Sequence, residues 1–162
     1  MLGLICCQPT GSMSLKDRCL LVRTDEKNMT EQSEKLVTIF GGSGFIGRHL
    51  VRRLAAQGWR VRVAVRDIEK ATFLKVAGRV GQISLTPTSI SNEASVKKAV
   101  QGANAVVNLV GILFERGKRS FSSVHERGSE IVAKAAAEAG AGRFVHMSAL
   151  GADSASPSKY AQ

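Results

Sequence analysis

Three glycines spaced three residues apart are the strongest chemical signal in this sequence. Gly41, Gly44 and Gly47 stand in the stretch VTIFGGSGFIGRHL, directly after an apolar run and before a segment with helical periodicity. A glycine turn between a strand and a helix lets the backbone approach a phosphate closely, and the first helix amides face the anion. We therefore predict that this turn binds the pyrophosphate of a dinucleotide. A glycine-rich turn that holds no ligand is the alternative.

The end of the second apolar run indicates which dinucleotide is bound. The stretch VRVAVRD ends in Val65, Arg66 and Asp67. NAD sites place a carboxylate about 20 residues after the glycine motif, where it accepts hydrogen bonds from the ribose hydroxyls. A guanidinium at this place instead pairs with a 2′-phosphate. Arg66 therefore favours NADP(H), and NAD(H) is the alternative, with Asp67 on the ribose if Arg66 points to solvent.

Apolar runs and helical patterns alternate from residue 35 onward and define the elements that position these residues. The patterns predict strands over 36–40, 60–65, 80–85, 105–111 and 143–150. They predict helices over 45–57, 68–77, 92–101 and 124–139, the third capped by Ser91 or Asn92. Such alternation implies right-handed crossovers and a parallel sheet covered on both faces. We predict an α/β fold, a Rossmann-type doubly wound parallel sheet over 35–162, after a disordered N-terminal tail over 1–34.

Composition limits the classes of partner. A chain of 162 residues corresponds to about one domain. The net charge of +10 is spread along the chain, with one Tyr and one Trp for base stacking, so we predict no specific nucleic-acid site. No apolar run approaches the roughly 18 residues of a transmembrane helix. The cysteines (Cys6, Cys7 and Cys19) and the histidines His49 and His125 lack ligand spacing, so we predict no metal.

Three longer stretches resemble a known family. TIFGGSGFIGRHLVRRLAAQGWRVRVAVRD, SISNEASVKKAVQGANAVVNLVG and RFVHMSALGADSASPSKY resemble an extended or atypical short-chain dehydrogenase/reductase. The segments NLVGIL and HMSALGAD are similar, more narrowly, to the NAD(P)H-binding accessory subunit of respiratory complex I and its bacterial relatives. The resemblance covers residues 35–162 and implies a Rossmann domain that is incomplete at its C-terminus.

The resemblance also implies a role for individual residues around the cofactor. Arg66 takes the 2′-phosphate, and Ser89 stands where many relatives have an Asp beside the adenine, which weakens the contact with the adenine amine. The further cofactor-binding residues that it implies are Gly41, Ser43, Gly44, Phe45, Ile46 and Gly47 at the pyrophosphate, Ile90 beside the adenine, and Leu109, Val110 and Gly111 on the path toward the nicotinamide.

Catalysis in the family uses a Ser or Thr, a Tyr as general acid/base, and a Lys one helical turn after the Tyr. Tyr160 matches the tyrosine, and the position of the lysine lies just beyond Gln162. Ala149 aligns best with the catalytic hydroxyl, and Ser148 replaces it only if the strand shifts by one residue. Tyr160 and Ser148 are therefore the candidate catalytic residues, and we expect His146 in the core or at the cofactor edge.

The leading interpretation is an NADP(H)-binding Rossmann domain that holds the cofactor for structure or redox sensing. Its expected partners are complex I subunits or another acidic protein surface. One alternative is the N-terminal part of an NAD(P)-dependent sugar-nucleotide epimerase/dehydratase or reductase, and another is a basic interaction protein with a vestigial pocket. The resemblance implies the cytoplasm, including the periphery of the inner membrane, or the mitochondrial matrix in a eukaryote.

Overall fold

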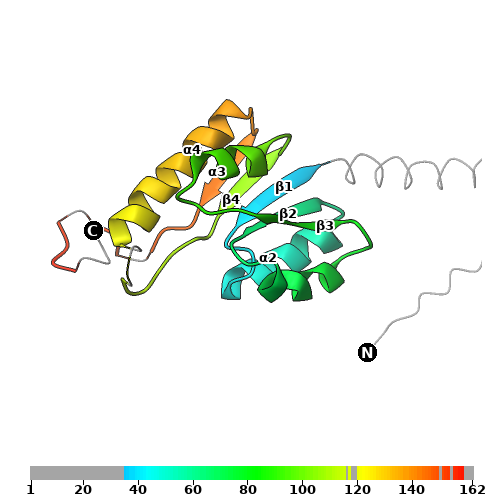
Figure 1. Ribbon diagram of the computed structural model, residues 1–162, viewed down its shortest axis with the longest axis horizontal. Helices are drawn as coiled ribbons and strands as arrows, with labels where there is room; N and C mark the ends of the chain where they lie inside the picture. Colours follow the sequence, from blue (N-terminus) through cyan, green and yellow to red (C-terminus); the bar gives the residue numbers. More distant parts are fainter. Residues whose placement is uncertain (1–34, 116, 118–119, 150, 154, 159–162) are drawn as a thin grey trace, which may run out of the picture.

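Five parallel strands form one sheet in the order β3-β2-β1-β4-β5 in the computed structural model (Figure 1). The structure describes residues 35–115, 117, 120–149, 151–153 and 155–158, so the predicted tail over 1–34 and Tyr160 lie outside the described residues. The strands are β1 (Leu36–Phe40), β2 (Arg60–Val65), β3 (Ile83–Pro87), β4 (Ala105–Asn108) and β5 (Arg143–His146). This order confirms the predicted Rossmann-type sheet, in which the chain moves outward in both directions from the central β1.

Helices cover both faces of the sheet, as a doubly wound fold requires. Along the chain they are α2 (Phe45–Ala56), the 3₁₀-helix η1 (Glu69–Ala77), α3 (Glu93–Val100), the π-helical turn η2 (Ser122–Glu126) and α4 (Arg127–Glu138). Figure 1 shows α3 and α4 on one side of the sheet and α2 on the other. The two faces hold two separate clusters of buried side chains, one under α2 and η1 and one under α3 and α4.

The apolar runs read from the sequence supply both clusters. All five residues of β1 are buried, because this strand has neighbours on both sides and helices on both faces. Val51 of α2 and Val132 of α4 are completely buried on opposite faces. Each such side chain contributes about 1.5–3 kcal/mol relative to an exposed one. Each helix therefore packs on the sheet through its apolar side.

Three strands have bounds that differ from the prediction. β3 begins at Ile83 instead of residue 80, because the preceding residues form a turn in which the Gln82 amide donates to the Arg79 carbonyl (3.0 Å). It extends to Pro87, which an edge strand tolerates. β4 ends at Asn108 and β5 at His146, both earlier than predicted, and the residues that follow line the cavities described below.

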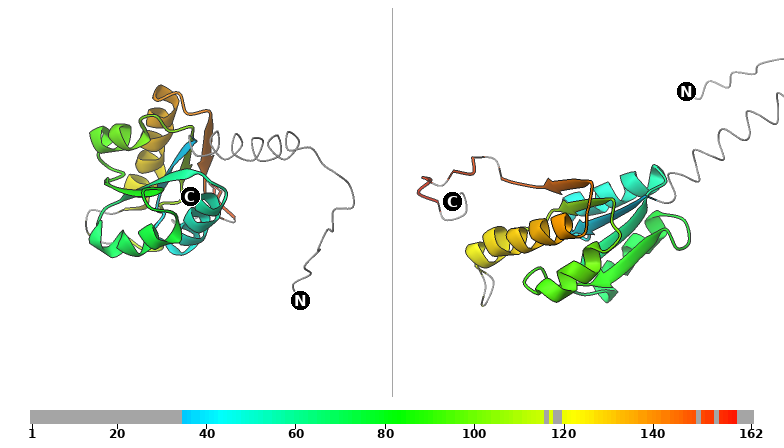
Figure 2. Two further views of the ribbon diagram at one scale, coloured as in Figure 1. Left: turned by 90° about the vertical axis from the view of Figure 1, so that its right-hand side faces the viewer. Right: turned by 90° about the horizontal axis from the view of Figure 1, so that it is seen from above.

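β5 lies at one edge of the sheet and pairs only with β4 in the described part of the chain (Figure 2). Every one of its residues is exposed, including Phe144 and Val145.

Among the described residues, no helix combines the length and the apolar character that a bilayer crossing requires.

Candidate nucleotide-binding site

The chain leaves the neighbouring strands β1 and β4 in opposite directions, and this arrangement creates a crevice at their carboxyl ends. In open α/β sheets, ligands bind at this switch point. The Leu109 amide donates to the Phe40 carbonyl (2.9 Å), so the backbone following β4 lies directly beside the end of β1. A Cβ atom on Gly41 would stand 2.9 Å from the Leu109 carbonyl carbon, and Gly41 has a φ of +78°. Only glycine fits there without strain.

Two glycines of the turn, Gly47 and Gly44, differ in how closely the protein packs around them. A Cβ on Gly47 would lie 2.5 Å from the Gly42 Cα, so Gly47 is needed where α2 packs on the turn. A Cβ on Gly44 would meet only the Gly41 carbonyl oxygen, at 3.2 Å, and Gly44 has an ordinary φ of −72°. Packing therefore requires glycine at position 47, whereas at position 44 it opposes a side chain only through one tight contact with a backbone oxygen. Close approach of a ligand is a second reason for glycine at position 44.

The start of α2 offers backbone amides to an anion. Its N-cap is Gly44, which has no side chain to bond the first amides, and the first turn of the helix contains no acidic residue. The first amides of a helix have no intrahelical acceptor. Phe45 and Ile46, which carry two of these amides, are 78% and 51% exposed. The turn thus has the donors and the positive dipole end that bind phosphate groups.

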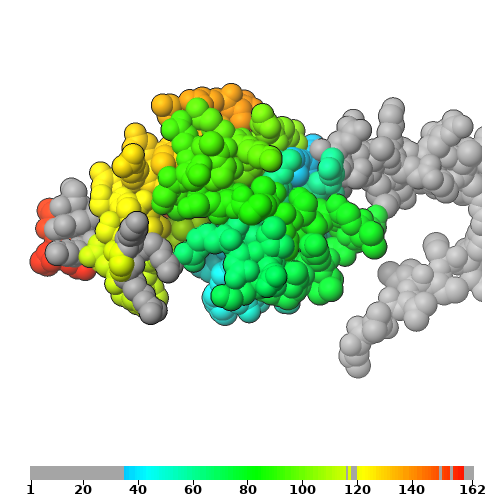
Figure 3. Space-filling view, viewed as in Figure 1, coloured from blue at the N-terminus to red at the C-terminus, as the bar shows by residue number. Residues whose placement is uncertain are grey.

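Two adjoining cavities meet at this turn. The first, the Arg66 cavity, has a volume of about 310 Å³ and is lined by the carboxyl ends of β1, β2, β3 and β4. The second, the His146 cavity, has a volume of about 590 Å³ and lies between the start of α2 and the ends of β4 and β5. Figure 3 shows the surface hollowed between the start of α2 and the segment that precedes α4. The residues lining both cavities are Gly41, Gly44, Leu109, Val110, Gly111 and Ile112.

Every residue predicted to bind the cofactor lies on one of these cavities. Those on the Arg66 cavity alone are Ser43, Arg66, Ser89 and Ile90. Those on the His146 cavity alone are Phe45, Ile46 and Gly47, and the remaining ones, Gly41, Gly44, Leu109, Val110 and Gly111, line both. The structure thus brings together residues that the sequence separates by up to 70 positions.

Arg66 and Asp67 differ in what they face. Arg66 is exposed and lines the Arg66 cavity. Asp67 turns to the start of η1, where its Oδ1 accepts from the Lys70 amide (3.3 Å) and its Oδ2 lies 3.3 Å from the Lys70 Nζ. The hydrogen bond from the Lys70 amide, more than the lysine charge, lowers the pKa of Asp67. The carboxylate is therefore engaged at the end of a helix, while the guanidinium remains at the cavity.

The loop after β3 closes the far side of the Arg66 cavity. Ser89 is exposed, and its carbonyl accepts from the Ser95 hydroxyl (3.2 Å), which ties the loop to α3. Ile90 is partly buried against the α3–α4 cluster, and a Cβ on Gly128 would lie 3.2 Å from its Cγ1. An apolar side chain beside a polar, exposed one is a suitable floor for a flat heteroaromatic ring.

Asn108 shapes the turn after β4, and the sequence analysis did not single it out. It is completely buried, its Oδ1 accepts from the Val110 amide (3.1 Å), and its Nδ2 lies 3.2 Å from the Ser129 Oγ and 3.2 Å from the His146 Nδ1. These bonds hold β4, β5 and α4 at the edge of the His146 cavity. The available signal was a single amide in the apolar run AVVNLVG, immediately before the predicted cofactor residues.

His125, for which the sequence predicts no metal site, contacts the segment that follows β4. It lies in the π-helical turn η2, and its Nε2 accepts from the Ile112 amide (2.8 Å). This bond fixes the segment after Gly111 against η2, and π-helical turns recur at functional sites. In the part of the chain that the structure describes, no group of three or more His, Cys, Asp or Glu side chains could hold a metal ion.

Of the two candidate catalytic residues, Ser148 lies within the described part of the chain and Tyr160 lies outside it. Ser148 is exposed and lines the His146 cavity together with Ala149. His146 is exposed and lines the same cavity, so the expectation that it lies in the core is wrong. Its place at the cofactor edge stays a prediction.

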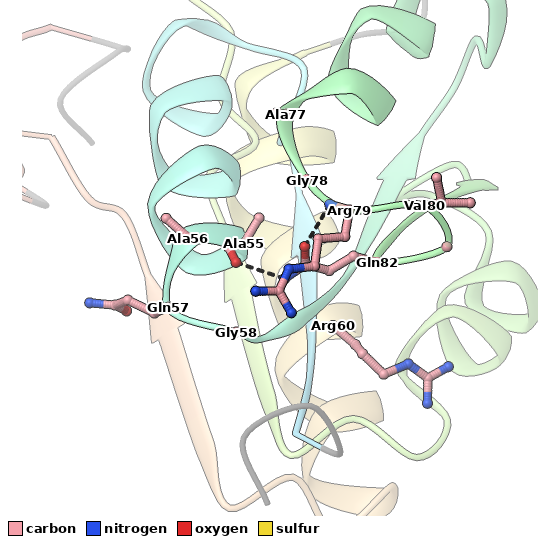
Figure 4. Close-up of a pocket in the computed structure, with 11 residues that line it drawn as sticks. Ala55, Ala56, Gln57, Gly58, Arg60, Ala77, Gly78, Arg79, Val80 and Gln82 are labelled. Carbon is pink, nitrogen blue, oxygen red and sulfur yellow. Dashed lines mark hydrogen bonds between the residues drawn. The ribbon is translucent and has the colours of Figure 1, made fainter. Parts of the chain in front are cut away.

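A further cavity, of about 690 Å³, lies at the opposite end of the strands, around the end of α2 and the start of β2. Figure 4 shows Gln82 bridging its walls, with its Nε2 donating to the Ala55 carbonyl (2.7 Å) and its Oε1 accepting from the Arg79 amide (2.8 Å). The side chains of Gln57 and Arg60 point away from this bridge. The cavity lies at the amino end of the sheet, away from the switch point, and Gln82 serves to close the end of α2.

A family model described as NAD(P)H-binding matches residues 41–162, which begin at the first glycine of the turn. The chain belongs to the NAD(P)H-binding family. Solved structures agree with this fold: a short-chain dehydrogenase from Bacillus anthracis superposes with a TM-score of 0.66 at 23% identity, over 80% of this chain and 62% of that one.

Curated relatives of this NAD(P)H-binding chain confirm the narrower resemblance. The Neurospora crassa mitochondrial NADH-ubiquinone oxidoreductase 40 kDa subunit is 36% identical over 72% of this chain and 31% of its own length. The Arabidopsis thaliana mitochondrial NADH dehydrogenase [ubiquinone] 1 alpha subcomplex subunit 9 is 34% identical over 94% and 39%. A Caulobacter vibrioides ceramide reductase is 33% identical over 82% and 40%. The chain spans about a third to two fifths of these relatives.

Proposed function

We propose that this chain binds NADPH across the switch point of the sheet. The adenosine half occupies the Arg66 cavity, the pyrophosphate lies on the amides at the start of α2, and the nicotinamide half enters the His146 cavity. The order of these three regions along the crevice supports the assignment, because the glycine turn borders both cavities. The domain that carries this function is residues 35–162.

The preference for NADPH rests on the different surroundings of the two charged residues at the end of β2. Arg66 lines the cavity, whereas Asp67 is occupied by Lys70. A free carboxylate there would repel a 2′-phosphate, and a guanidinium forms charge-assisted hydrogen bonds with it. NADH lacks this phosphate, so Arg66 distinguishes the two cofactors while the rest of the site serves both.

A titration with both cofactors tests this assignment. We expect NADPH to bind more tightly than NADH, and Arg66→Ala to weaken NADPH by roughly tenfold, the effect of one charge-assisted contact at an exposed site. Arg79→Ala removes the same charge at the amino end of the sheet, away from the switch point, and serves as the matched control. Equal loss of NADPH and NADH in Arg66→Ala, or the same loss in Arg79→Ala, contradicts the role of Arg66.

The biological role that we propose is that of a cofactor-stabilised subunit. A nucleotide that binds only the folded domain stabilises it by mass action, without turnover. The relatives named as mitochondrial oxidoreductase subunits support this role. The partners that we propose are complex I subunits or another acidic protein surface, and the compartment is the mitochondrial matrix in a eukaryote. Removal of the nucleotide should then lower both the melting temperature and the assembly of the partner complex.

A reductase is the second candidate, and one observation favours it. The His146 cavity is open beyond the glycine turn and has apolar walls that include Leu113 and Met147, so it offers room for a second molecule beside the nicotinamide. The relative named ceramide reductase agrees with this reading. The test is turnover of a carbonyl substrate with NADPH by the full-length protein. Turnover that disappears in Tyr160→Phe would favour the reductase over the cofactor-stabilised subunit.

A further inference from the structure

The orientation of the Asn108 amide is fixed by the backbone. A backbone N–H can only donate, so the Asn108 atom that faces the Val110 amide at 3.1 Å must be the carbonyl oxygen. The amide nitrogen then faces the Ser129 hydroxyl and the His146 ring, each at 3.2 Å. If the oxygen and nitrogen of the Asn108 amide were exchanged, two N–H donors would face each other at the Val110 amide. Asn108 is completely buried, so no water could satisfy them.

This orientation determines the tautomer of His146. The Asn108 Nδ2 is a donor, so the Nδ1 of His146 must accept, and the ring proton is therefore on Nε2. The pairing of β4 with β5 keeps the two side chains in register, since Asn108 lies opposite His146 and the Met147 amide donates to the Asn108 carbonyl (3.0 Å). Phe144 stacks on the ring, with planes 5° apart and centroids at 6.5 Å.

The surroundings of His146 show what its Nε2–H can meet. The polar side chains of the His146 cavity are His125, His146 and Ser148, and the Nε2 of His125 is occupied by the Ile112 amide. Among the residues that the structure describes, nothing is hydrogen-bonded to the Nε2 of His146. The cavity thus presents an oriented N–H donor within mainly apolar walls, and such a donor is complementary to a hydrogen-bond acceptor on a ligand that enters it.

We infer that His146 is a binding residue that donates a hydrogen bond from Nε2–H to a carbonyl oxygen in this cavity, with Asn108 as the residue that positions it. This inference rests on the proposed function, because that function places the nicotinamide half here. A carbonyl oxygen can come from the carboxamide of the cofactor or from a second bound molecule. No bond is made or broken by His146 in this role.

Nitrogen-15 NMR of histidine-labelled protein tests the tautomer directly. We expect the His146 Nδ1 to resonate as an unprotonated nitrogen and Nε2 as a protonated one, and Asn108→Ala to give a mixture of tautomers. Ser129→Ala is the matched control, because it removes the other partner of the Asn108 amide and leaves the contact with His146 in place. A wild-type ring protonated on Nδ1 would overturn the inference.

Ligand titrations on the same sample identify the source of the carbonyl. NADPH should shift the Nε2 signal of His146, and 2′-phospho-ADP-ribose, which lacks the nicotinamide, should bind without shifting it. A shift only when cyclohexanone is added to the nucleotide-saturated protein assigns the contact to a second molecule. No shift in either titration refutes the donor role.

Affinities separate this contact from the dinucleotide site as a whole. If the carboxamide is the acceptor, His146→Leu should weaken NADPH by about 3- to 10-fold, the value of one hydrogen bond, and leave 2′-phospho-ADP-ribose unchanged. His146→Gln retains an N–H donor and should recover most of the loss. A protein that binds neither nucleotide refutes the proposed function, and in that case the cyclohexanone titration of the nucleotide-free protein decides the role of His146.

Discussion

Replacement of Gly44 by alanine separates ligand binding from folding at the glycine turn. The added Cβ would meet only the Gly41 carbonyl oxygen, at 3.2 Å, and the φ of −72° suits any residue. Alanine also reduces the entropy of the unfolded chain, which stabilises by about 0.4–1 kcal/mol. The tight contact with the Gly41 carbonyl oxygen opposes this gain, so we expect the free energy of unfolding without nucleotide to change by less than about 1 kcal/mol.

In the proposed binding mode, the same methyl group stands where the pyrophosphate approaches the first amides of α2. Loss of hydrogen bonds to a charged group costs about 1.5–3 kcal/mol, which corresponds to roughly 10- to 150-fold in affinity. At an NADPH concentration of about 100 times the wild-type dissociation constant, wild type gains about 2.7 kcal/mol. A variant weakened 100-fold gains about 0.4 kcal/mol under the same conditions.

Thermal unfolding followed by circular dichroism, with and without NADPH, measures this difference. For a domain of this size 1 kcal/mol corresponds to about 2–4 °C, so NADPH should raise the wild-type melting temperature by about 5–11 °C and that of Gly44→Ala by less than about 2 °C. Gly47→Ala is the contrasting variant, because its Cβ would lie 2.5 Å from the Gly42 Cα and should destabilise the free protein. A full NADPH shift in Gly44→Ala would refute the assignment of the turn to the pyrophosphate.

Two further predictions concern α3. Asn92→Ala should lower the free energy of unfolding in urea by about 1 kcal/mol, because the Asn92 Oδ1 caps the Ser95 amide (3.0 Å), whereas Ser91→Ala should have little effect; equal losses would contradict the cap. The side-chain hydrogen bond from Lys97, at 3.0 Å, lowers the pKa of Glu93, so carbon-13 NMR should show this pKa rising toward 4.5 in Lys97→Ala. Because the folded pKa is depressed, the contribution of Glu93 to stability is present at neutral pH and is lost as the pH falls through that folded pKa. An unchanged pKa in Lys97→Ala would refute the pairing.

The order of the elements was predictable, because it depends on patterns that lie along the chain. The runs LVTIF and RVRVAV became β1 and β2 with the predicted bounds, and the glycine turn lies between β1 and α2 as expected. Boundaries failed where a local turn or a side-chain hydrogen bond replaces the expected strand. At the end of β4, the Asn108 side chain accepts a hydrogen bond from the Val110 amide. A hydropathy pattern does not reveal such a side-chain bond.

The site was predictable where it depends on the turn and on strand ends, and unpredictable where it depends on packing between distant elements. Arg66 follows from its place after β2 alone. The contact of His125 with the Ile112 amide requires the π-helical turn, and the contact of His146 with Asn108 requires the pairing of β4 and β5. Neither juxtaposition has a signature within a short stretch of sequence.

The π-helical turn η2 fixes the length of the segment that leads into α4. A π-helical hydrogen bond spans one residue more than an α-helical one, so the π turn adds one residue to the helical segment. One residue corresponds to about 100° of rotation around an α-helix. Val132 must face the core and His125 must face Ile112, so both orientations depend on that extra residue. A one-residue deletion within η2 would regularise the helix and rotate either the core face of α4 or the wall of the cavity out of place. Insertions and deletions in this segment are therefore constrained by helical phase, even though the turn itself carries none of the predicted cofactor contacts.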